Sequence, residues 1–247
     1  MASKKLPPTK KKTTEKLAVN KLEIRLVAPT SEFSDRFIQY MLDQMGGRSL
    51  ERYGLSGERY PAKAQALPII TERLTEYLFT RNTKFLIDAA NFAMIEFMHP
   101  SLADAFFAGT DSNESPGRAF IGGDVTSERN SEQEIRAERP SGAMLALETL
   151  TPATEYSVLF IQGMINRMGV SFLKYGPLAG AYPDKVNALD SARVRLEKYR
   201  STNNTEFLMD AANFAMIEYM RPSLTSTFYN PLADTSSLGK AALKALK

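Results

Sequence analysis

Cysteine is absent from this chain of 247 residues, and histidine occurs once, at position 99. Without cysteine the protein has no disulfide, no thiolate nucleophile and no cysteine-ligated zinc site. His99 precedes Pro100 in a segment that recurs later in the chain, where Arg221 takes its place. We therefore interpret His99 as a helix-end residue rather than as a catalytic or metal-binding group. A bound metal ion would need oxygen ligands, which favours magnesium or manganese.

Long apolar runs are also missing, because no stretch approaches the roughly 18 residues that cross a bilayer. The formal net charge is +3, yet residues 1–16 contain six lysines and one glutamate, so this segment carries +5 and the rest −2. The basic segment has no apolar periodicity and no apolar core of a secretory signal. We expect a solvated, disordered tail, with nucleic-acid contact only through it. We expect a cytoplasmic protein without a membrane partner.

The chain does contain an internal repeat. Residues 88–102 read DAANFAMIEFMHPSL and residues 210–224 read DAANFAMIEYMRPSL, identical at thirteen of fifteen positions at an offset of 122. The same offset, without a gap, aligns further pairs, among them Gly47 with Gly169, Tyr60 with Tyr182, Leu74 with Leu196 and Phe106 with Phe228. We interpret this as a tandem duplication of one domain of roughly a hundred residues. The copies should pack as a pseudo-symmetric pair, as the subunits of a homodimer do.

Apolar residues at helical spacing predict three helices in each copy. We expect helices near residues 33–45, 62–80 and 84–98, and again near 153–168, 184–201 and 205–220. The third helix of each copy is apolar nearly all round, so we expect both to be buried near the pseudo-twofold axis. No strand pattern is evident.

The predicted fold class is therefore all-α, a tandem-duplicated bundle of two similar three- to four-helix units with pseudo-twofold symmetry. The expected organisation is a basic tail (1–25), a first helical repeat (26–120), a linker (121–150) and a second helical repeat (151–247) ending in a short amphipathic helix.

Both predicted third helices carry the same polar side chains on an apolar background. Asp88, Asn91 and Glu96 recur as Asp210, Asn213 and Glu218. Buried carboxylates are costly unless they are paired or bind a metal ion. Two interpretations stay open: internal hydrogen bonds and salt bridges, or a site for magnesium or a polar ligand. The second copy also has Glu206 where the first has Lys84, and two acids one turn apart repel unless a cation lies between them.

The predicted second helices share an arginine and a tyrosine, Arg73 with Tyr77 and Arg195 with Tyr199. An arginine suits a phosphate group and a tyrosine suits a base, so these four residues, with Asn91 and Asn213, are candidate ligand-binding residues. The acids of these helices are not shared between copies. They extend the candidate metal ligands beyond Asp88, Glu96, Asp210 and Glu218 to Glu72, Glu76, Glu197 and Glu206. The turn-rich segment 110–118 is either a plain loop or a phosphate-binding loop.

The run LIDAANFAM, following the second helix, resembles the all-α nucleoside-triphosphate pyrophosphohydrolases of the MazG-like group, in particular small uncharacterised phage and bacterial relatives. The resemblance covers about residues 62–102 and 184–224. In that family a Glu-Glu-x-x-Glu helix faces a Glu-x-x-Asp helix, and together they hold magnesium and the triphosphate. Asp88 and Asp210 match the Asp of the second motif, but Phe85 and Phe207 replace its Glu. Glu72 and Glu76 match part of the first motif, and the second copy offers only Glu197.

The resemblance implies a protein that binds a nucleotide or a nucleotide-derived ligand with magnesium. It also implies a weak pyrophosphohydrolase activity, although the incomplete acidic motif leaves hydrolysis open. The alternative from a different class is a non-catalytic helical scaffold or interaction protein, phage-encoded in keeping with the nearest resemblances. Under the alternative the buried acids are paired internally.

Overall fold

The computed structural model describes residues 19–46, 50, 53–109 and 143–231. The first half of the chain, residues 19–109, contains β1 (Asn20–Arg25), α1 (Asp35–Met45), α3 (Ala66–Thr80) and α4 (Lys84–Met98). The second half, residues 143–231, contains β2 (Met144–Thr149), α6 (Val158–Tyr175), α7 (Ala188–Thr202) and α8 (Glu206–Met220). The predominantly α-helical character is confirmed. The tandem duplication itself remains our interpretation of the sequence.

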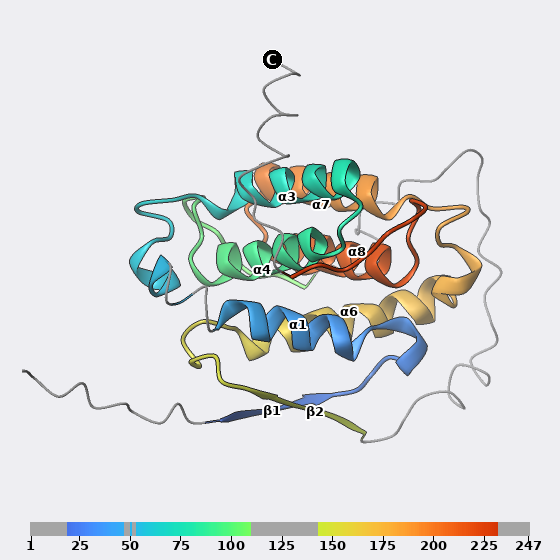
Figure 1. The fold of residues 1–247 in the computed structure, drawn as a ribbon, viewed down its shortest axis with the longest axis horizontal. Helices are drawn as coiled ribbons and strands as arrows, with labels where there is room; N and C mark the ends of the chain where they lie inside the picture. Colours follow the sequence, from blue (N-terminus) through green and yellow to red (C-terminus); the bar gives the residue numbers. More distant parts are fainter. Residues whose placement is uncertain (1–18, 47–49, 51–52, 110–142, 232–247) are drawn as a thin grey trace, which may run out of the picture.

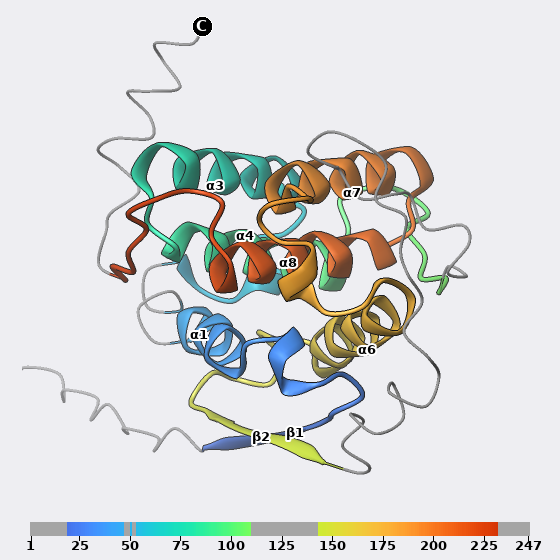
Figure 2. The ribbon, with the colours of Figure 1, turned by 90° about the vertical axis from the view of Figure 1, so that its right-hand side faces the viewer.

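Helices from the two halves are stacked in pairs (Figures 1 and 2). The two outer helices α3 and α7 cover α4 and α8, beneath which lie α1 and α6 and then the two strands. Helix α4 packs directly on α8, while α3 packs on α4 and α7 on α8. The third helices therefore lie at the centre, as expected from their apolar sequences. Ala90 and Ala212 are at most 1% exposed there, and small side chains let two helix backbones approach closely.

Two strands pair across the halves, so the expectation of no strand was wrong. β1 and β2 form an antiparallel pair whose register places Glu23 opposite Ala146. Leu22 and Ile24 are buried beneath α1 and α6 while their neighbours face outward, which is the alternation of a half-buried strand. The alternation in this strand spans few residues and adjoins the lysine-rich tail, so it was overlooked. β1 lies within the residues assigned to the tail and β2 within those assigned to the linker.

The beginnings of the two halves correspond at an offset of 123 rather than 122. Ser34 and Ser157 cap α1 and α6 alike, each accepting a hydrogen bond from the backbone N–H three residues later. Glu32 and Glu155 also correspond at 123, because each carboxylate accepts a backbone N–H from the opposite half, that of Leu178 or Ser56. The ungapped alignment therefore needs a one-residue gap between the first and second helices.

Several helices begin at residues other than those expected, for local reasons. The third helices, α4 and α8, begin and end within one residue of the prediction. Helices α3 and α7 begin four residues later than expected, after turns that follow the Tyr-Pro pairs. Helix α6 begins at Val158 because Ser157 caps it. The predicted loop at 110–118 and the C-terminal amphipathic helix lie outside the described residues. No helix of the described segments is long and apolar enough to cross a bilayer.

Candidate functional site

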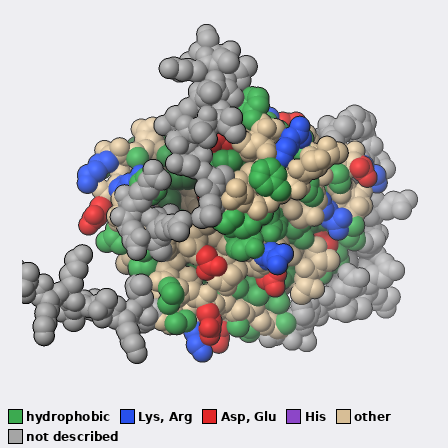
Figure 3. Space-filling view, in the orientation of Figure 1, with side chains coloured by type: hydrophobic (Ala, Val, Ile, Leu, Met, Phe, Trp, Pro, Cys, Tyr) green, Lys and Arg blue, Asp and Glu red, His purple; other side chains and the backbone are tan. Residues whose placement is uncertain are grey.

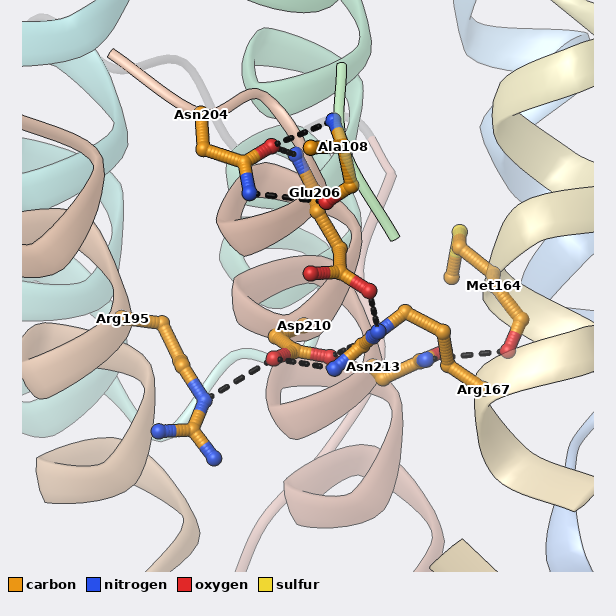
Figure 4. A network of polar contacts seen from close by, with 8 residues as sticks. All are labelled: Ala108, Met164, Arg167, Arg195, Asn204, Glu206, Asp210 and Asn213. Carbon is orange, nitrogen blue, oxygen red and sulfur yellow. Dashed lines mark hydrogen bonds and ion pairs between the residues drawn. The ribbon is translucent and has the colours of Figure 1, made fainter. Parts of the chain in front are cut away.

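An ion-pair network joins α6, α7 and α8 in the second half (Figure 4). Arg167 on α6 points between Glu206 and Asp210 on α8 and pairs with both. Its Nη2 also donates to Asp210 Oδ2 at 2.9 Å, and Arg195 Nε on α7 lies 2.9 Å from the same oxygen. The side chains of Glu206 and Asp210 are only 3% and 9% exposed. The cation required between these two acids is therefore the guanidinium of Arg167.

Hydrogen bonds around this network hold its members in place. Asn204 Oδ1 accepts the N–H of Glu206, the first residue of α8, at 3.1 Å. Asn213 Nδ2 donates to the Met164 carbonyl at 3.0 Å, which ties α8 to α6. Burial lowers the pKa of Arg195, and the neighbouring carboxylate of Asp210 opposes that shift. The two arginines of the network balance the charge of its two carboxylates.

The first half has a different set of side chains at the corresponding positions. Gln44 stands where the second half has Arg167, and Lys84 stands where it has Glu206. Lys84 Nζ lies 2.6 Å from Asp88 Oδ2, and Arg73 Nε lies 4.0 Å from the same oxygen. The glutamine–lysine pair of the first half carries one more positive charge than the arginine–glutamate pair of the second half. It also lacks the long side chain of Arg167.

A pocket of about 550 Å³ occupies this region of the first half. It lies between the end of α1, the segment 53–60, α3 and α4, with Glu155 and Pro231 contributed by the second half. Gln44, Lys84 and Asp88 all line it. Its volume falls within the range of roughly 300–1,000 Å³ found for small-molecule sites.

Arg59 is a cation of the pocket wall that forms no ion pair with the described residues. Its guanidinium lies 4.7 Å from the ring centroid of Tyr53 and 5.2 Å from that of Tyr60. Among the described residues, no carboxylate lies within ion-pairing distance of it. The lining carboxylates already have partners, because Asp88 pairs with Lys84 and Glu155 accepts the Ser56 N–H at 2.9 Å. An anion entering this pocket would therefore find Arg59 available.

Asn91 presents a second uncommitted polar group on the pocket wall. Its residue is 5% exposed, and its Oδ1 accepts no hydrogen bond from the described residues. A buried amide oxygen without a donor is costly, so a ligand N–H or a water there would lower the free energy. Phe92 is the next residue of α4, and the guanidinium of Arg73 lies 5.9 Å from the centroid of its ring.

Four other predicted site residues form two reciprocal hydrogen bonds between the halves. Tyr77 donates to Glu218 Oε1 and Tyr199 donates to Glu96 Oε1, each at 2.9 Å. The same carboxylate oxygens accept both the backbone N–H and the hydroxyl of Ser223 and Ser101, respectively. Burial raises the pKa of both tyrosine hydroxyls, and the carboxylates raise it further. We call these two sets the inter-half clasps, because they join the two halves.

The donor set does not suit a protein-ligated magnesium ion. Among the described residues, no three carboxylate or histidine side chains gather where they could hold a metal. Asp210 and Glu206 face a guanidinium, Asp88 faces an ammonium, and the clasp glutamates face hydroxyl and amide donors. Glu76 pairs with Arg73. Burial raises the pKa of Glu76, and the pairing with Arg73 opposes that shift. Glu197 pairs with Arg200 with 70% of its side chain exposed. Glu72 belongs to no described ion pair.

Sequence reasoning missed Gln44, Ser56, Arg59 and Arg167, and it assigned His99 no functional role. The sequence did contain a signal for Arg167, because the two acids one turn apart on α8 required a cation between them. That signal did not say which helix supplies it. Gln44 corresponds to Arg167 only at the offset of 123, which the ungapped alignment concealed.

Glu218 should give the protein a measurable pH dependence. Burial raises its pKa above the ordinary 4.5, opposed by hydrogen bonds from Ser223 and Tyr77. The folded state therefore binds this proton more tightly than the unfolded chain does. Its contribution to stability is full below pH 4.5 and is lost as the pH rises through the folded pKa. Glu218→Gln cannot titrate, so its unfolding free energy should rise relative to wild type from about pH 4 to neutrality, by roughly 1.4 kcal/mol per unit of pKa shift.

Urea denaturation of both proteins across that range measures the effect. Glu23→Gln, on the exposed face of β1, serves as the matched control and should show no such trend. A difference between Glu218→Gln and wild type that stays constant with pH would contradict the assignment.

Comparisons with known proteins give no relative for this chain: no family model, no curated protein and no solved structure matches it significantly.

Proposed function

We propose that the protein binds an anionic, phosphate-bearing small molecule of nucleotide size in the pocket of the first half. The carrying observation is the contrast between the halves. Where Arg167 pairs with Glu206 and Asp210 in the second half, Gln44 and Lys84 line a pocket of about 550 Å³ in the first. Other positions around the two sites keep the same residue, among them Arg73, Asp88 and Asn91, which match Arg195, Asp210 and Asn213.

The chemistry of the pocket wall supports a nucleotide rather than a bare phosphate ion. Arg59 offers a guanidinium for phosphate oxygens, and Lys84 and Arg73 add positive potential nearby. Tyr53, Tyr60 and Phe92 line the same pocket with aromatic faces that suit a base. This agrees with the expectation, drawn from the MazG-like resemblance, of a nucleotide or nucleotide-derived ligand.

Magnesium enters this proposal with the ligand. Because the predicted acidic ligands other than Glu72 have internal partners, we expect a bound ion to be carried mainly by the ligand's phosphates. Glu76 and Asp88, which match acids of the two family motifs, each pair with a cation of this chain, Arg73 and Lys84. Binding is therefore the proposal, and pyrophosphate release is assayed separately.

One observation favours the scaffold alternative. The two clasps use Glu96 and Glu218 to join the halves, which is what internally paired acids in a structural protein do. The exposed face in Figure 3 agrees in part, since acidic and basic side chains lie interspersed there among hydrophobic ones. Under this alternative the pocket has no specific small-molecule ligand.

Thermal unfolding with a ligand panel separates the two functions. The panel contains nucleoside triphosphates, deoxynucleotides and cyclic dinucleotides, each with and without magnesium. A ligand at a hundred times its Kd adds about 2.7 kcal/mol, which raises the unfolding temperature by roughly 5–10 °C for a chain of this size. No shift at millimolar concentration for any member would overturn the nucleotide proposal.

A double substitution that copies the second half tests whether the response arises in this pocket. Gln44→Arg with Lys84→Glu installs the second half's residues in the first half and should fill the pocket. We expect the ligand-induced shift to disappear while the ligand-free protein keeps its unfolding temperature within a few degrees. Arg59→Gln should weaken binding about 10- to 100-fold, as expected for the loss of one charge-assisted hydrogen bond.

The matched control is Arg167→Gln with Glu206→Lys, the reverse exchange in the second half. It leaves the first-half pocket untouched and should preserve the ligand response. If the closed variant still responds and this control does not, the ligand binds elsewhere and the assignment of the pocket is wrong.

A further inference from the structure

A serine and the single histidine of the chain meet beside the first-half pocket. Ser56 Oγ lies 3.3 Å from His99 Nε2, within reach of a hydrogen bond. Ser56 lines the pocket and is 5% exposed, while His99 follows the last residue of α4. In the tautomer protonated on Nδ1, the Nε2 of this imidazole accepts the hydroxyl proton.

Both partners are held in place by contacts that do not use their functional atoms. The Ser56 backbone N–H donates to Glu155 of the second half at 2.9 Å. The His99 backbone N–H donates to the Ile95 carbonyl at 2.8 Å. The imidazole packs on Gly57, where a Cβ atom would lie 3.4 Å from its Cε1. The hydroxyl and the ring nitrogen are therefore kept close without help from each other.

The second half shows that the fold does not require this pair. Leu178 and Arg221 take the places of Ser56 and His99, and Glu32 still accepts the Leu178 N–H at 2.9 Å. The turn is thus built the same way without the serine and the histidine. The pair occurs in the half that has the pocket and is replaced in the half that contains Arg167. The serine and the histidine therefore accompany the pocket rather than the shared fold, which indicates a chemical role for them.

We propose that Ser56 and His99 act as nucleophile and general base on carboxylic esters bound in the first-half pocket. Ser56 Oγ would form a bond to the ester carbonyl carbon while its proton passes to His99 Nε2. Collapse breaks the bond to the alcohol oxygen, which leaves with that proton. Water then attacks the acyl carbon, gives its proton to His99, and releases the carboxylic acid as Ser56 regains the proton.

Arg59 indicates which esters the site would prefer. It lies three residues after Ser56 and lines the same pocket, where its guanidinium has no carboxylate partner among the described residues. An ester that carries an anionic group on its acyl or alcohol part would be positioned by this cation. Ester hydrolysis at Ser56 requires the pocket of the proposed function, but it does not require that the ligand of this pocket is a nucleotide.

Labelling with a fluorophosphonate probe tests the activated serine without knowledge of the substrate. The probe's phosphorus bonds to Oγ and fluoride leaves, and peptide mass spectrometry locates the adduct. We expect Ser56 to be labelled in the native protein and not after heat unfolding. His99→Gln should slow the labelling about 100-fold or more, as expected for loss of a general base. Hydrolysis of p-nitrophenyl acetate should fall in parallel.

The controls keep the test decisive. Ser191→Ala removes a serine of the second half that is 1% exposed and should leave labelling unchanged. His99→Arg installs the second half's own residue and separates loss of the base from loss of folding. Absence of an adduct on Ser56, or equal labelling rates in wild type and His99→Gln, overturns the proposal. The nucleotide panel fails or succeeds independently, because it reports binding and not nucleophilicity.

Discussion

Arg167→Ala should lower the free energy of unfolding by about 3–5 kcal/mol, the largest effect expected of any single substitution here. The substitution leaves Glu206 and Asp210, 3% and 9% exposed, one turn apart on α8 with Arg195 as the remaining cation. Two carboxylates in a low-dielectric interior repel each other and lose hydration that nothing replaces. Urea or thermal denaturation measures the change, which corresponds to a fall in unfolding temperature on the order of 10 °C.

The chain provides its own compensated control for this substitution. Arg167→Gln with Glu206→Lys copies the Gln44 and Lys84 arrangement, in which Lys84 Nζ lies 2.6 Å from Asp88. It should recover most of the lost stability, because Asp210 again has a cation one turn before it. A loss below about 1 kcal/mol for Arg167→Ala would show that the network adds little beyond what a surface ion pair contributes.

Tyr77→Phe combined with Tyr199→Phe should destabilise the protein by about 3–6 kcal/mol, because each removes a hydrogen bond to a charged acceptor worth about 1.5–3 kcal/mol. Both tyrosines are fully buried and donate across the halves to Glu218 and Glu96. Each carboxylate oxygen would keep its two serine donors but lose the hydroxyl that joins it to the opposite outer helix. Chemical denaturation of the single and double variants measures the change and the coupling between the clasps.

Tyr40→Phe is the matched control for the clasps. Tyr40 stacks on Tyr229 at 4.5 Å, and its hydroxyl makes no hydrogen bond to the described residues. Its loss should change stability by less than about 0.5 kcal/mol. If the clasp variants behave like this control, the halves are joined by apolar packing of α4 on α8 alone.

Much of the fold follows from local pattern. The third helices were predictable almost to the residue, because a helix apolar on every side must be buried and both copies carry it. Of the acids on these helices, Asp210 pairs internally with Arg167 and Arg195. The strands were not predicted, since Leu22 and Ile24 become a strand only by pairing with residues more than a hundred positions away.

The sequence by itself determined the repeat, the helical class, the buried central helices and the need for partners to their acids. Only the tertiary structure decided what those partners are. Arg167 reaches Asp210 from another helix, Tyr77 reaches Glu218 from the other half, and Gln44 lines a pocket at the position that corresponds to Arg167. A local pattern reports which side chains must be buried, because burial depends on periodicity along one helix. The identity of a partner depends on which helices pack and in what register, which no single segment specifies.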